Sequence, residues 1–287
     1  MRRVLRNPLL LFGILFLLLL FLFALLGPVV RTNQLRPPGS TNFDAVTDRI
    51  GKTYEIPQWP EKPLGTDENG RDVLARLAQG ARVSLLVGVV VQVFAVGAGV
   101  LVGVLGSFAG RWVRMPLLRF TDAMFAFPDI LLAILIVGTF AGAGLGVIPV
   151  IVALGITAWP SFARLTVTQI ASVRDREYVV AARAAGASTP YLVTRHILPQ
   201  VLPLVLAVSM VEMAGTVLSE STLSYIGIGI QPPNPSWGNM ISDVRQADIT
   251  AHVPQLVAPC LILSLTIFAL NFVGDGVLAA LDPKKGA

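Results

Sequence analysis

Four carboxylates that lie in or beside apolar segments are the side chains of this sequence most able to do unusual chemistry. Asp122, Asp129 and Glu212 fall within stretches that are long and apolar enough to cross a membrane, and Asp275 lies near the end of another. A charge at the centre of a bilayer costs about 2.5–3.5 kcal/mol on insertion scales, so each group should face other helices or a water-filled path. Groups in such positions can line a route for a polar solute or relay protons.

Glu212 is the best candidate to line a translocation path, because it lies in the middle of its apolar segment. We expect Asp129 and Glu220 to line the same path. The structural alternative is that these carboxylates cap helix ends or form pairs near a membrane surface. For Asp275 a role at a helix end is the better interpretation.

The sequence offers no set of residues for catalysis, metal binding or nucleotide binding. His196 and His252 are predicted on opposite sides of the membrane, and Cys260 is the single cysteine. Gly51-Lys52-Thr53 resembles the end of a phosphate-binding loop, but Val46 occupies the position of the required first glycine. We therefore expect a non-catalytic chain with no cofactor or metal of its own.

The composition indicates an integral membrane protein that would have to hold these groups between helices. The chain has 287 residues, of which 54% are hydrophobic and 14% are charged. Soluble domains have about 25% charged residues, so little water-facing surface is available here. The net charge of +5 comes from basic residues that cluster beside apolar runs. This pattern is typical of membrane topology and argues against nucleic-acid binding.

The apolar runs predict an all-α, polytopic fold with six membrane-spanning helices. The 34 uncharged residues from Ile130 to Ala163 exceed one span, and the glycine-rich break at 138–146 divides them between two helices. The third helix must then begin near 115, which places Asp122 and Asp129 inside it. We expect residues 1–82 to form a retained first helix with an extracytoplasmic segment, and residues 83–287 to form a five-helix core. The predicted spans are 9–26, 83–110, about 115–138, 147–162, 199–220 and 255–273.

Basic residues predict the orientation of these spans. Six spans place both termini on one side, and thirteen arginines and lysines fall on that side, whereas the last loop of the other side has only Arg245 and the basic residues of its long first loop are nearly balanced by acids. By the positive-inside rule that side is cytosolic. The residues concerned are Arg2, Arg3, Arg6, Arg111, Arg114, Arg119, Arg164, Arg174, Arg176, Arg183, Arg195, Lys284 and Lys285.

Residues 164–198 form a polar, helix-forming island between the fourth and fifth spans. Strong helix formers precede Gly186, which is a plausible helix stop. A short helix, a glycine break and a second helix would present Ala181, Ala184 and Ala185 to a soluble partner at close range. The alternative is an ordinary pair of amphipathic helices on the membrane surface.

This island resembles the conserved loop of permease subunits in binding-protein-dependent ATP-binding-cassette importers. Ala181, Ala182, Gly186 and the pair Leu198-Pro199 match that loop, whereas Val180 replaces its first glutamate. His196 stands where an isoleucine is expected. Further segments are similar to the C-type permeases of dipeptide and oligopeptide importers, namely 64–74, 125–128, 159–164, 223–238 and 271–276.

The resemblance implies a type I importer permease with a MetI-like fold in the cell (inner) membrane. Its implied partners are a second permease, two cytosolic ATPases that bind ATP and Mg, an extracytoplasmic solute-binding protein and a peptide cargo. Dipeptides, longer peptides, nickel chelates and glutathione-like molecules remain open as cargo. The rival hypothesis is an ion-coupled secondary transporter that uses Asp129 or Glu212. The expected contacts with the ATPases are Arg176, Glu177, Ala181, Ala182, Ala185, Gly186, Ala187, Ser188, Leu198 and Pro199.

Overall fold

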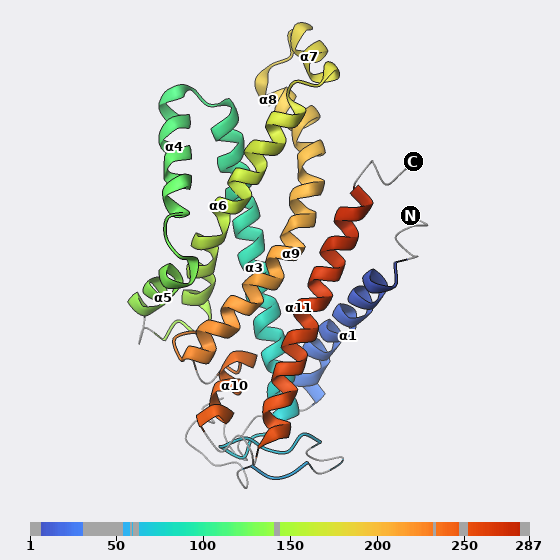
Figure 1. Cartoon of the computed structure of the whole chain (residues 1–287), viewed down its shortest axis with the longest axis vertical. Helices are drawn as coiled ribbons and strands as arrows, with labels where there is room; N and C mark the ends of the chain where they lie inside the picture. Colours follow the sequence, from blue (N-terminus) through green and yellow to red (C-terminus); the bar gives the residue numbers. More distant parts are fainter. Residues whose placement is uncertain are drawn as a thin grey trace.

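The chain folds into a bundle of long helices with shorter helices at both ends (Figure 1). The computed structural model describes residues 7–30, 54–57, 59, 63–140, 144–231, 234–246 and 252–281. In these ranges the ordered structure is helical apart from an isolated bridge between Thr66 and Asp72, which confirms the predicted fold class. The predictions for positions 2, 3, 6, 46, 51–53, 284 and 285 lie outside the described residues.

The long helices run along the bundle, and the short ones connect or cover them. α7 and α8 lie at one end of the molecule, and α10 lies at the other (Figure 1). A π-helical turn, η2 (Val193–Ile197), joins α8 to α9. The long helices are α1 (Pro8–Val30), α3 (Val73–Phe108), α6 (Ile148–Val173), α9 (Leu198–Ile226) and α11 (Val253–Leu281). The short helices are α4 (Arg111–Met124), α5 (Asp129–Thr139), α7 (Glu177–Ala184), α8 (Thr189–Leu192) and α10 (Trp237–Gln246).

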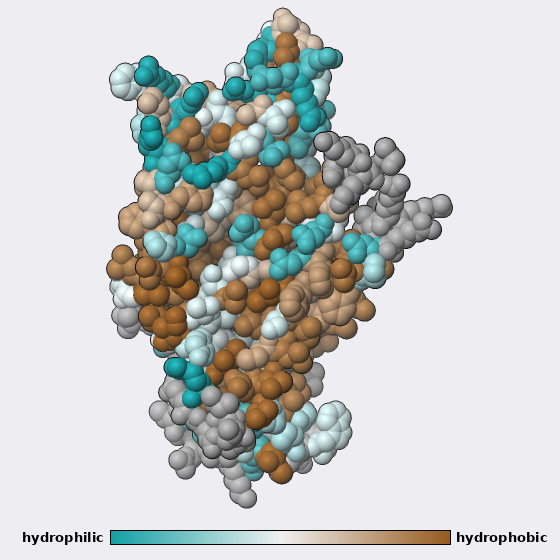
Figure 2. Space-filling view, viewed as in Figure 1, coloured by the Kyte–Doolittle hydropathy of each residue, from teal (hydrophilic) through white to brown (hydrophobic). Residues whose placement is uncertain are grey.

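The described helices agree with the predicted number of membrane spans. Five of them are long and apolar enough to cross a membrane, and the bent pair α4–α5 makes up to six if it counts as one. Figure 2 shows hydrophilic side chains gathered at the end that carries α4 and α7, and a hydrophobic belt beside it. α1 runs toward the end that carries α10, and α11 runs back from it (Figure 1).

The third span is broken, which corrects the prediction of one continuous helix. α4 ends at Met124, α5 begins at Asp129, and the two are bent by 93°. Pro128 explains the break, because proline lacks a backbone N–H and disfavours helical geometry in the residue before it. Pro128 itself is extended (φ −62°, ψ 120°). Asp129 is therefore the first residue of a helix and not an interior one.

Two helices extend beyond their predicted bounds, because each continues into charged sequence. α3 begins at Val73, so the division proposed between residues 82 and 83 falls inside a helix. The side chain of Asp72 caps this helix by accepting from the amide of Leu74 at 2.9 Å. α6 continues to Val173, so Arg164 lies within a helix and not in a loop.

Glycines allow α3 and α6 to approach each other closely. A Cβ atom at Gly99 would lie 2.4 Å from the Cβ of Phe162, and one at Gly103 would lie 2.5 Å from the Cβ of Thr166. Small residues at such positions are typical of membrane helix pairs. This contact packs α6 tightly against α3, so the loop that follows α6 starts from a helix held in the bundle.

Candidate functional site

The loop that we expect to contact the ATPases, residues 174–197 and called the coupling loop here, projects beyond the ends of α6 and α9 (Figure 1). Val179 is completely buried and belongs to a hydrophobic cluster with Val173, Leu192 and Ile197. These residues come from α6, α7, α8 and η2. The loop is therefore anchored to the bundle by a core of its own and can move with the helices that carry it.

Gly186 ends α7, as the sequence predicted. Its φ of +87° is left-handed, a conformation that glycine adopts without steric cost. The amide of Gly186 donates to the carbonyl of Arg183 at 3.0 Å, and the amide of Ala187 donates to that of Ala182 at 3.1 Å. These two bonds form a Schellman motif, so the turn after α7 has a defined geometry.

The outer face of α7 is exposed, and several of its side chains are alanines. Ala181, Ala184 and Ala185 are exposed, whereas Ala182 is half-buried against the hydrophobic cluster. Arg176 and Glu177 begin α7, and their side chains are exposed. Exposed small side chains would let a partner's backbone approach α7 closely, so the role of these residues as partner contacts stays a prediction.

Ser188, Leu198 and Pro199 frame the second half of the loop. Ser188 precedes α8, and its side chain makes no capping hydrogen bond. Leu198 and Pro199 begin α9, but the chain does not break there, because helix runs without interruption from Thr189 to Ile226. The π turn before α9 accommodates Pro199, which lacks an amide hydrogen and crowds the preceding turn.

The loop also exposes an aromatic group that sequence reasoning missed. Tyr178, Tyr191 and His196 come together, with the histidine ring 6.2 Å from that of Tyr178 and 5.5 Å from that of Tyr191. Tyr178 is 40% exposed, Val180 48% and Tyr191 52%. His196 and Val180 depart from the residues expected in this loop, and these departures were the signals in the sequence that could have pointed to the exposed group. Together with the alanines they give the loop an apolar surface suited to a protein partner.

Asp129 and Glu212 line one cavity between α5, α6 and α9. Its volume is roughly 210 Å³, and the other polar side chains around it carry hydroxyl groups. No basic side chain lines it, and neither carboxylate forms an ion pair within the described part of the chain. The remaining lining residues are Ile130, Ala133, Leu154, Thr157, Ala158, Ser161, Gly215, Thr216, Ser219 and Leu223.

Glu220, which we expected to line the same path as Asp129 and Glu212, does not line this cavity. Its side chain is completely buried. The hydroxyl of Ser84 on α3 donates to it at 2.7 Å, and that of Ser224 donates at 2.9 Å. A carboxylate buried in this way needs such donors. The neighbouring hydroxyls fix Glu220 as a contact between α3 and α9, which sequence position alone did not reveal.

Comparison with known proteins gives a match over most of the chain. Residues 95–286 match the family described as binding-protein-dependent transport system inner membrane component. The chain belongs to this family. The matched range includes both the coupling loop and the cavity that Asp129 and Glu212 line. This inner membrane component is thus a multi-pass membrane protein of a transport system that also contains ATPase and binding-protein subunits.

Several transport system permeases are similar to this inner membrane component over much of its length. The dipeptide transport system permease protein DppC of Bacillus subtilis (strain 168) is 34% identical over 283 residues, 99% of this chain and 84% of that protein. The oligopeptide transport system permease protein OppC of Haemophilus influenzae is 37% identical over 222 residues, 77% of this chain and 70% of that protein. The glutathione transport system permease protein GsiD of Pectobacterium atrosepticum is 33% identical over 266 residues, 92% and 85% of the two.

Solved structures confirm the predicted fold. An inward-facing structure of the MetNI methionine ABC transporter has a TM-score of 0.58 at 20% identity, covering 72% of this chain and 96% of that one. An amino acid ABC transporter crystallised with histidines has a TM-score of 0.54 at 15% identity, covering 71% and 92%. At these identities the likeness concerns the arrangement of helices alone.

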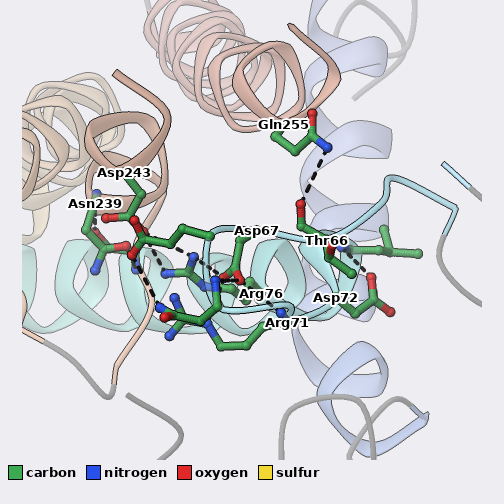
Figure 3. Close-up of polar contacts among 12 residues, drawn as sticks. Thr66, Asp67, Arg71, Asp72, Arg76, Asn239, Asp243 and Gln255 are labelled. Atoms are coloured by element: carbon green, nitrogen blue, oxygen red, sulfur yellow. Dashed lines mark hydrogen bonds and ion pairs between the residues drawn. The ribbon is translucent and has the colours of Figure 1, made fainter. Parts of the chain in front are cut away.

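The end of this inner membrane component opposite α7 is held by an ion-pair network, here Asp67, Arg71, Arg76 and Asp243 (Figure 3). The Oδ2 atom of Asp67 lies 2.7 Å from both Arg71 Nε and Arg76 Nη1, and Arg76 Nη1 also lies 3.2 Å from Asp243 on α10. Burial lowers the pKa of the Arg71 guanidinium, with Arg76 adding to the effect and Asp67 opposing it. The network joins the turn before α3 to α10.

α10 also contacts α3 through the side chain of Trp237. The indole Nε1 of Trp237 donates to the carbonyl of Leu77 at 3.2 Å. A Cβ atom at Gly80 would lie 3.1 Å from the Trp237 ring, and one at Gly238 would lie 2.1 Å from the carbonyl of Ser221. The start of α10 therefore packs closely against α3 and the end of α9.

Proposed function

We propose that this inner membrane component is the permease subunit of an ATP-driven peptide importer. The observation that carries the proposal is the coupling loop: an exposed, alanine-rich helix and turn in a chain whose relatives are named dipeptide and oligopeptide transport system permeases. The described residues contain no cluster of His, Cys, Asp or Glu that could hold a metal ion. ATP and Mg are assigned to partner ATPases, which would supply the work that the permease uses.

The proposed assembly contains two related permeases side by side, two cytosolic ATPases and an extracytoplasmic solute-binding protein. The termini and the coupling loop face the cytosol. Arg174, Arg176, Arg183 and Arg195 lie in or beside this loop, and the excess of arginine supports that orientation. The ATPases would contact α7 and the aromatic group at Tyr178, Tyr191 and His196.

The path for the peptide is proposed to pass the cavity lined by Asp129 and Glu212. These carboxylates lie in spanning segments and have no described basic partner, so a hydrocarbon environment would be costly for them. The second permease or water must therefore cover this face. Glu212 is exposed in the isolated chain, as a group in a path between two subunits would be.

The alternative of an ion-coupled secondary transporter is not supported by the family assignment. The experiment that tests the proposed function is reconstitution of the permease in lipid vesicles with its second permease, ATPases and binding protein. We expect uptake of a labelled dipeptide that requires hydrolysable ATP and persists when an ionophore collapses the ion gradients. Uptake that needs an ion gradient and continues without ATP would contradict the proposal.

A further inference from the structure

Arg164 on α6 makes one contact with the last turn of α4 and one with the residue that follows it. Its Nη2 atom lies 3.1 Å from Oδ1 of Asp122, in the last turn of α4. Its guanidinium carbon lies 4.0 Å from the ring centre of Phe125, which directly follows α4. A guanidinium is planar and can pair with a carboxylate while it stacks on an aromatic face. This one side chain therefore fixes both the position and the orientation of the turn.

A second contact holds α4 against α6 further along. The ring of Trp159 stacks on that of Phe120, with centroids 5.9 Å apart and planes at 18°. Trp159 and Arg164 lie more than one turn apart on α6, so α6 contacts α4 at two points along its length. Between them these contacts place the end of α4 relative to α6.

The direction of α5 depends on this turn. Because the helix is interrupted between Met124 and Asp129, no continuous ladder of hydrogen bonds holds α5 at a set angle to α4. α5 begins with Asp129, which lines the acidic cavity. A shift of the turn at Phe125 would therefore change where the Asp129 carboxylate sits.

α6 connects this turn to the coupling loop. It lines the cavity with Leu154, Thr157, Ala158 and Ser161, carries Arg164 one turn later, and ends at Val173. α7 begins at Glu177, and buried Val179 packs in the same cluster as Val173. A push on α7 is therefore delivered to a single helix, α6, that touches both the turn and the cavity.

We propose that Arg164 is a positioning residue that transmits the movement of α7 to the α4–α5 turn and so sets the place of Asp129 in the cavity. The proposal rests on the proposed function, because it assigns the route by which movement of the ATPases reaches the path. The side chains of Arg164 and Asp122 are 57% and 56% exposed. Exposed ion pairs add little to folding stability, so replacing this pair should affect transport far more than folding.

The test compares Arg164→Gln with Arg114→Gln in the reconstituted complex. Arg114 is an exposed arginine on α4 whose side chain forms no ion pair or hydrogen bond with a described residue, and it serves as the matched control. Three quantities are measured: ATP hydrolysis, peptide uptake, and the rate at which a thiol reagent labels Ile130→Cys in a Cys260→Ser background. Ile130 lines the cavity beside Asp129, so its labelling reports the position of α5.

For Arg164→Gln we expect a complex that assembles and hydrolyses ATP, with uptake per ATP reduced about fivefold or more, the lower end of typical coupling between sites. The difference in Ile130→Cys labelling between ATP-free and ATP-bound complexes should also disappear. Asp122→Asn and Phe125→Leu each remove one of the two contacts and should give intermediate losses. Arg114→Gln should behave as the unchanged protein does.

A wild-type ratio of uptake to hydrolysis in Arg164→Gln, with wild-type labelling, would overturn the proposal. If Arg164→Gln does not accumulate in the membrane, the same measurements are made on Asp122→Asn and Phe125→Leu. A wild-type ratio of uptake to hydrolysis in both variants would overturn the proposal. A complete absence of ATP-dependent peptide uptake in the unchanged complex would instead contradict the proposed function. The nucleotide-dependent labelling of Ile130→Cys would still test the role of Arg164 in that case.

Discussion

The hydroxyl of Ser84 donates a 2.7 Å hydrogen bond to the carboxylate of Glu220, and this contact joins α3 to α9 inside the bundle. Ser224 donates to the other carboxylate oxygen at 2.9 Å, and Glu220 has no exposed surface. The arrangement satisfies the carboxylate with hydroxyl groups and leaves it out of reach of a solute. Glu220 therefore differs in role from Glu212, although both lie on α9.

Glu220→Ala should destabilise the protein, because the hydroxyls of Ser84 and Ser224 would lose their acceptor in a buried site. A buried donor left unpaired costs about 1–3 kcal/mol. The effect is measured by heating the protein in detergent and determining the fraction that remains monodisperse at each temperature. Glu220→Gln keeps an oxygen acceptor and should lose less stability. Equal stability of the alanine variant and the unchanged protein would contradict the structural role.

Gly186→Val should uncouple the permease from its ATPases while leaving it in the membrane. The left-handed backbone at this position is strained for any residue with a Cβ atom, and especially for a β-branched one. No atom lies within 4 Å of a Cβ built at Gly186, so the effect would come from the backbone alone. Co-purification of the ATPases measures it, and Gly186→Asn is the control because asparagine tolerates this conformation. Full ATPase recovery with Gly186→Val would count against the Schellman turn as a docking element.

Glu212→Gln and Asp129→Asn should each reduce peptide uptake about tenfold, equivalent to roughly 1.4 kcal/mol, without loss of assembly. Each change removes a charge from a cavity that a charged solute would pass. Asp275→Asn is the matched control, since Asp275 is exposed on α11 and does not line the cavity. Uptake and assembly at wild-type levels in both cavity variants would remove these carboxylates from the path.

Asp67→Asn should destabilise the fold more than Asp243→Asn. Asp67 is 7% exposed and accepts from two arginines at 2.7 Å, whereas Asp243 is 24% exposed and, among the described residues, forms an ion pair with Arg76 alone, at 3.2 Å. Removing one member of a buried ion pair costs about 3–5 kcal/mol. Chemical or thermal unfolding of the two variants provides the comparison. The reverse order of stability would show that Arg76 depends mainly on α10 and not on the turn before α3.

The sequence predicted the features that follow from local rules. The helical class, the number of spans and the stop at Gly186 depend on apolar length and backbone preference, and these agree with the structure. The exposure of Ala181 and Ala185 also agrees. Such features are set by residues close together in the chain, so periodicity and composition are enough to find them.

The features that the sequence did not predict depend on contacts between distant segments. The burial of Glu220 is decided by Ser84, and the pairing of Asp122 is decided by Arg164. The helical extension of α3 through Arg76 depends on Asp67 and Asp243. A charged residue looks the same in sequence whether it lies in a water-filled path or is buried with its partners. Only the tertiary arrangement separates these cases.

Access to Ser188 tests the central claim most directly, since that claim places the coupling loop in the cytosol against the ATPases. Ser188 is exposed beside Gly186, and Ser188→Cys in a Cys260→Ser background gives a single thiol. A membrane-impermeant maleimide should label it in inverted vesicles but not in intact cells, and bound ATPases should slow the labelling. Labelling in intact cells would place the loop outside and contradict the account.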